Sequence, residues 1–184
     1  MKEGDKVPQV TLQGMDGKPL PLKTLLDKTL VLYFYPKDDT SGCTSEAIAF
    51  TGLIDDFAKA GVRVVGVSKD PPAKHAKFID KHGLKVDLAT DADGSVLEAF
   101  GTWIEKSLYG RKYMGIERAT FLIGRDGKVA KVWHKVKVAG PCAEGLAAAR
   151  RVTVFFASAR GSTRGEKPAR GGGPGLPSRG RAGW

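Results

Sequence analysis

The sequence predicts an α/β fold in which helices flank a mixed central β-sheet. Two near-continuous apolar runs, 29–36 and 62–68, are rich in β-branched and aromatic residues, as is typical of strands buried on both faces. Between them, Ser41–Lys59 carries apolar residues at helical spacing. Strands that alternate with helices through right-handed crossovers favour a sheet covered by helices on both faces.

The first half of the chain supplies clear boundaries for its elements. Asp16-Gly17 lies between short mixed segments and predicts an N-terminal β-hairpin, because this dipeptide suits a two-residue turn with positive φ. Pro36 ends the first apolar run, and Gly61 stands where the long helix should stop. A helix is expected over 71–83, with proline in its first turn.

The second half repeats the alternation with shorter elements. A short strand is expected over 86–91 and a short helix over 94–101. Two strands within 119–136 are joined near Asp126-Gly127, and a last helix over 141–151 begins at a proline. The order predicts a thioredoxin-like fold with an added N-terminal hairpin.

Composition divides the 184 residues into a body, 1–151, and a basic tail, 152–184. The 41% hydrophobic content is sufficient for one core. From 151 onward, one acid, Glu166, stands against seven basic residues, Arg151, Arg160, Arg164, Lys167, Arg170, Arg179 and Arg181. Because this segment is rich in Gly, Pro and Ser, disorder is expected from about residue 158. A solvated tail is the default interpretation, and phosphate or nucleic-acid binding is the alternative.

The cysteine count and the N-terminus indicate a compartment. Two cysteines, Cys43 and Cys142, are too few for a disulfide scaffold and lack zinc-site spacing. No signal-peptide segment and no membrane-length apolar run are visible, so a soluble, cytoplasmic protein is expected. His75, His82 and His134 are scattered, which favours packing or surface roles over metal binding.

The segment around Cys43 has the features of a reactive thiol site. Cys43 falls in the first turn of the predicted helix, where free N–H groups and the helix dipole stabilise a thiolate. Thr40 can place its hydroxyl beside the sulfur, and Pro36 can shield the sulfur from water. Glu46 could reach back to first-turn N–H groups, as in a capping box. Buried packing is the usual role of a free cysteine, but the polar flanks "KDDTSGCTSE" disfavour it here.

These residues also carry a family resemblance. Pro36, Thr40 and Cys43 spell P-x-x-x-T-x-x-C, which resembles the active-site signature of peroxiredoxins. The segments "FYPKDDTSGCTSEAIAF" and "ERATFLIGRDGKVAKVWHKVKVAG" are similar to the bacterioferritin comigratory protein, or peroxiredoxin Q, subfamily. The resemblance covers roughly Lys6–Arg150 and implies the peroxiredoxin type of thioredoxin-like fold.

The resemblance implies a function and a set of roles. The chain is expected to be a thiol-dependent peroxidase that reduces hydrogen peroxide and organic hydroperoxides without a cofactor or metal. Cys43 would be the peroxidatic nucleophile and Thr40 would orient the peroxide, while Pro36 would shield the pocket. Arg118, in "ERATFLI", would bind both thiolate and substrate. A chaperone-like or nucleic-acid-associated binding module on the same fold is the alternative function.

The sequence does not identify the thiol that would restore Cys43 after its oxidation. Relatives carry a resolving cysteine five residues after the first or in the next helix, where this chain has Ile48 and Ile79. Cys142 is then either a resolving thiol or a packing residue. A one-cysteine cycle is favoured, with thioredoxin, a glutaredoxin system or a small-molecule thiol as the reductant, and a monomer is expected from the resemblance.

Overall fold

A seven-stranded mixed sheet forms the centre of the fold in the computed structural model, which describes residues 1–135 and 140–161. In spatial order its strands are β2 (Pro19–Pro21), β1 (Thr11–Gln13), β5 (Asp87–Thr90), β4 (Val62–Ser68), β3 (Thr29–Phe34), β8 (Ala119–Ile123) and β9 (Val129–His134). Strands β3, β4 and β5 run parallel, whereas β1, β8 and β9 are antiparallel to their neighbours. The predicted mixed sheet and N-terminal hairpin are confirmed.

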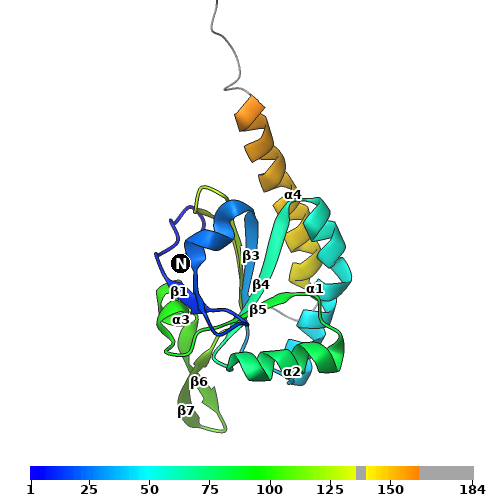
Figure 1. The fold of residues 1–184 in the computed structure, drawn as a ribbon. Helices are drawn as coiled ribbons and strands as arrows, with labels where there is room; N and C mark the ends of the chain where they lie inside the picture. The colour runs from blue at the N-terminus through cyan, green and yellow to red at the C-terminus, as the bar shows by residue number, and fades with distance from the viewer. Residues whose placement is uncertain (136–139, 162–184) are drawn as a thin grey trace, which may run out of the picture.

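Helices cover both faces of this sheet (Figure 1). On one face, α1 (Ser41–Lys59), α2 (Pro72–His82) and α4 (Gly140–Gly161) bury apolar side chains in a shared core that includes Phe50, Phe78 and Leu146. On the other face, η1 (Leu22–Asp27) and α3 (Ser95–Phe100) pack into a second core. The molecule therefore has three layers, with the sheet in the middle.

The central elements coincide with the predicted ones because their local signals are strong. Every residue of β3 is buried, as the uninterrupted apolar run predicts. Helix α1 begins at Ser41 and ends at Lys59, and β4 spans Val62–Ser68, as expected. Gly83 ends α2 in the left-handed conformation, with φ of 60°.

A two-stranded ribbon formed by β6 (Trp103–Leu108) and β7 (Arg111–Ile116) is absent from the sequence prediction. Most of its residues are exposed or half-buried, so it lacks the apolar run that marked the central strands. The turn uses positive φ at Tyr109 and Gly110. The ribbon projects from the body in Figure 1 and leads back into the sheet at Arg118.

The last helix is longer than the sequence predicts, since α4 continues past Arg151 to Gly161. The segment 152–160 contains no glycine or proline, so nothing interrupts the helix until Gly161. Phe156 also packs beside Gly124, and the Thr153 methyl group lies near Gly61. The expected boundary at 151 thus falls inside a helix, which continues past residue 158. The rest of the expected disordered tail, 162–184, lies outside the described residues.

None of the helices described within 1–135 and 140–161 has both the length and the apolar composition needed to cross a membrane.

Gly66 on β4 and Gly52 on α1 form a matched pair for testing the packing of the central sheet. A Cβ atom on Gly66 would lie 2.5 Å from Tyr33 Cζ and 2.9 Å from Leu88 Cδ2, whereas one on Gly52 would meet nothing within 4 Å. Gly66→Ala should therefore lower the free energy of unfolding by about 1–3 kcal/mol. Gly52→Ala should raise it by about 0.5–1 kcal/mol, because alanine favours a helix. Urea denaturation measures both, and equal effects would contradict the packing described.

Candidate active site

The register of the central sheet brings the predicted site residues to one end of the molecule. Phe34, the last residue of β3, pairs with Ala119, the first residue of the antiparallel strand β8. Arg118 immediately precedes β8, and the chain that leaves β3 enters α1 within a few residues. Arg118 and the start of α1 therefore meet although 75 positions separate Arg118 from Cys43.

Cys43 is the third residue of α1 and is only 2% exposed. Nη2 of Arg118 donates a hydrogen bond to its sulfur, with an Nη2–Sγ distance of 3.2 Å. The positive guanidinium and the first-turn N–H groups both favour a negative charge at this position. A positive group thus lies beside the thiol at the start of the helix.

Glu46 lies one helical turn after Cys43 and is 1% exposed. Its Oε2 atom accepts from Nη1 of Arg118 at 2.5 Å, so one guanidinium contacts both the sulfur and this carboxylate. Burial raises the pKa of Glu46 to about 7, although the Arg118 charge and hydrogen bond act in the opposite direction. The expected capping box is wrong, because the carboxylate points to Arg118 and α1 has no side-chain cap.

Thr40 is the N-cap residue of α1, and it is exposed. Its Oγ1 atom donates to the Lys37 carbonyl oxygen at 3.0 Å. Because a hydroxyl has one hydrogen, this bond leaves its oxygen lone pairs free to accept from a substrate O–H. Although the sequence places this hydroxyl beside the sulfur, no hydrogen bond between Thr40 and Cys43 is present among the described residues. Pro36 is also exposed, and its shielding role stays a prediction.

Cys142, in the first turns of α4, belongs to the same apolar core as Cys43. Both cysteines are free thiols. Burial raises the pKa of Cys142 to about 12, and the nearby charge of Glu46 adds to the effect. Cys142 is therefore protonated at neutral pH in this state of the protein and is a weak nucleophile.

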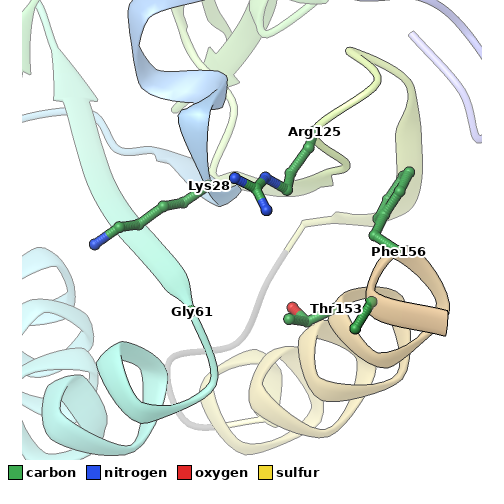
Figure 2. A pocket seen from close by; sticks show the side chains of 6 residues that line it. Lys28, Gly61, Arg125, Thr153 and Phe156 are labelled. Carbon is green, nitrogen blue, oxygen red and sulfur yellow. The ribbon is translucent and has the colours of Figure 1, made fainter. Parts of the chain in front are cut away.

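A cavity of about 480 Å³ lies elsewhere, at the opposite end of the sheet strands (Figure 2). Its walls come from loops near Lys28, Gly61 and Arg125 and from Thr153 and Phe156 of α4. The Cys43 site is not part of this cavity. Within the described residues, no group of three His, Cys, Asp or Glu side chains could hold a metal ion.

Comparison with known proteins shows the family of this chain. The family model described as AhpC/TSA matches residues 3–132. The chain belongs to this family. The match includes Cys43, Glu46 and Arg118, so the site lies within the part that defines the family.

The relatives are peroxiredoxins. The chain is 45% identical over 143 residues to peroxiredoxin Bcp of Bacillus subtilis, covering 78% of this chain and 91% of the relative. It is 41% identical over 137 residues to the Escherichia coli Bcp, with shares of 74% and 88%. A structure of the Xanthomonas campestris bacterioferritin comigratory protein superposes with a TM-score of 0.75 at 37% identity, covering 81% of this chain and 99% of that chain. The chain is thus a thiol-dependent peroxidase of the Bcp group of peroxiredoxins.

The sequence analysis of this peroxiredoxin did not predict a buried polar group beneath the loop between β3 and α1. Asp38 lies between Pro36 and Thr40, and its buried carboxylate contacts Tyr35 and His75. The two consecutive acids in "KDDT" were a signal that this loop needs partners. No sequence pattern near Asp38 shows that His75, 37 positions away, would lie beneath it.

Replacing Arg118 with lysine tests the shared guanidinium. Lysine keeps the charge, but its single ammonium nitrogen cannot reproduce the planar fork that reaches the carboxylate and the sulfur from two nitrogens. The second-order rate of peroxide reduction should fall about 10²–10³-fold, the usual cost of removing a transition-state donor. Arg125→Lys, in the exposed β8–β9 turn, is the matched control and should react at the wild-type rate. A wild-type rate for Arg118→Lys would exclude this role of the guanidinium.

Glu46→Gln tests the buried ion pair through pH. Because the pKa of Glu46 is about 7, the carboxylate is ionised above this pH and neutral below it. The wild type should react severalfold faster than Glu46→Gln at more than one pH unit above 7, where the ion pair holds Arg118. The two rates should converge more than one unit below 7, where both side chains are neutral. Stopped-flow kinetics across this range gives the ratio, and a ratio independent of pH would contradict the assignment.

Proposed function

We propose that Cys43 is the peroxidatic nucleophile of this peroxidase and that it acts on hydrogen peroxide and organic hydroperoxides. The observation that supports this role is the single Arg118 guanidinium, which contacts both the Cys43 sulfur and the buried Glu46 carboxylate. A thiolate so placed has a fixed positive group beside it and a helix N-terminus beneath it. The Xanthomonas campestris relative is described by its alkyl peroxide reduction activity, which supports the inclusion of organic hydroperoxides.

The chemical step follows from the positions of these groups. The Cys43 thiolate attacks the O–H oxygen of the hydroperoxide, an S–O bond forms and the O–O bond breaks. The departing oxygen carries the electron pair away as hydroxide or alkoxide and takes up a proton to become water or an alcohol. Arg118 stabilises the charge that develops, and Thr40 accepts a hydrogen bond from the peroxide O–H. Cys43 becomes a sulfenic acid.

The proposed cycle uses one cysteine of this chain and an external thiol. Cys142 supports this view, because burial raises its pKa to about 12 and keeps it protonated. The two positions that carry a resolving cysteine in relatives hold Ile48, which is 49% exposed, and Ile79, which packs against the core. An external thiol would attack the Cys43 sulfenic acid and release water, and a second thiol would then free Cys43 as the disulfide leaves.

The partners follow from this cycle. Thioredoxin, a glutaredoxin system or a small-molecule thiol would supply electrons to a monomer in a reducing compartment such as the cytoplasm. The alternative, a binding module that uses the basic tail, depends mainly on residues 162–184, which lie outside the described residues. No comparison with known proteins supports that alternative.

Replacement of each cysteine separates the nucleophile from the packing residue. Cys43→Ser should abolish peroxide reduction, because serine is not ionised at neutral pH and its oxygen is a poor nucleophile. Cys142→Ser should keep the rate of Cys43 oxidation within about threefold of wild type, since the proposed step does not use that thiol. Stopped-flow decay of peroxide measures both rates. Peroxidase activity retained in Cys43→Ser would overturn the assignment.

Mass spectrometry under non-reducing conditions tests the one-cysteine cycle. After one equivalent of peroxide, the mass should rise by one oxygen atom at Cys43. In a parallel sample, dimedone should convert this sulfenic acid to a thioether at Cys43 and release the oxygen as water. Cys142 should remain alkylatable after denaturation. A disulfide between Cys43 and Cys142 would instead establish a two-cysteine cycle.

A further inference from the structure

The loop between β3 and α1, residues 35–40, is held from below by a buried polar network. The side chains of Asp38 and His75 are both fully buried. Tyr35 Oη donates to Asp38 Oδ1 at 2.6 Å, and His75 Nδ1 lies 2.6 Å from Asp38 Oδ2. Because carboxylate oxygens only accept, His75 Nδ1 carries the proton and donates to Asp38. His75 Nε2 has no partner among the described residues.

One peptide unit connects this network to the Thr40 hydroxyl. The N–H of Asp38 donates to Asp70 Oδ2 at 2.7 Å, while the carbonyl of Lys37, in the same peptide plane, accepts from Thr40 Oγ1 at 3.0 Å. A peptide group is planar and rigid, so fixing its N–H side also fixes the direction of its carbonyl. The Asp38 carboxylate, which contacts Tyr35 and His75, anchors this residue through its side chain as well. The orientation of the Thr40 hydroxyl therefore depends on where Asp38 is held.

We propose that Asp38 and His75 are positioning residues for peroxide reduction, which fix the Lys37–Asp38 peptide so that the Thr40 hydroxyl accepts from the substrate O–H. This inference rests on the proposed function of Cys43 and Thr40. The network never touches the peroxide, and it acts only through the peptide that directs Thr40. Loss of the His75 donor frees the loop and leaves Thr40 misdirected, while Cys43 and Arg118 keep their contact.

Two amide substitutions at His75 separate positioning from simple packing. The asparagine amide nitrogen can occupy the place of Nδ1, whereas glutamine places its amide near Nε2, which has no partner in the described structure. The rate of Cys43 oxidation should fall about 10–100-fold in His75→Gln, the size of effect that follows a small misplacement of a reacting group. His75→Asn should recover the rate to within about threefold of wild type.

His82 provides a matched control on the same helix. Its Nε2 atom lies 2.7 Å from Asp39 Oδ1, the residue that follows Asp38, but this pair is at the surface. Exposed pairs contribute little. His82→Gln should therefore react within about twofold of wild type, although it also removes a bond between α2 and the loop.

A double-mutant cycle with Thr40→Val gives a result that a merely structural role would not produce. If His75 acts through the Thr40 hydroxyl, His75→Gln should have little further effect on the peroxide rate once Thr40 is valine. Urea denaturation of the same proteins shows whether the Asn and Gln variants lose stability equally. The proposal would be overturned if the fold-loss of rate in the double variant equals the product of the losses in His75→Gln and Thr40→Val. It would also be overturned if His75→Gln reacts at the wild-type rate. Activity that survives Cys43→Ser would instead refute the proposed function itself.

Discussion

The antiparallel pairing of β3 with β8 decides which side chains meet at the start of α1. Phe34 opposite Ala119 places the residue before β8 beside the loop that follows β3. Arg118 then lies within reach of Cys43 and Glu46, which share one face of the first two turns of α1. A shift of one residue in this register would turn the buried side chains of β8 to the opposite face, so packing of the two cores maintains the site.

Glu46 explains why the Arg118 guanidinium remains fixed next to a buried thiol. A carboxylate that is 1% exposed is costly unless a charged partner compensates for its lost hydration. Arg118 is that partner, and its planar group has donors to spare for the Cys43 sulfur. The carboxylate thus restricts the arginine, and the arginine keeps much of the carboxylate ionised near neutral pH.

Helix α2 contacts the loop between β3 and α1 through two of its histidines. Asp38 and Asp39 are consecutive, and both bond to histidines of α2, one beneath the loop and one at the surface. Asp39 has a φ of 62°, an uncommon conformation for a residue with a side chain, and Lys81 and His82 bond its carboxylate there. Ile79 on the same helix packs into the core instead of offering a thiol. The buried Asp38–His75 contact therefore suits a loop that keeps one shape during the proposed reaction, whereas the exposed pairs of Asp39 contribute little.

The sequence by itself determined the central elements, and it singled out Cys43 as the candidate reactive residue. Continuous apolar runs and helical spacing are local properties, so β3, α1 and β4 could be placed without knowledge of their neighbours. The signature that joins Pro36, Thr40 and Cys43 lies within one short segment of the chain and could be recognised in the same way. Only the tertiary structure decided that Glu46 pairs with Arg118 and that Asp38 lies on His75. Each of these depends on contacts between segments far apart in the chain, whose meeting is set by sheet register and packing rather than by local sequence.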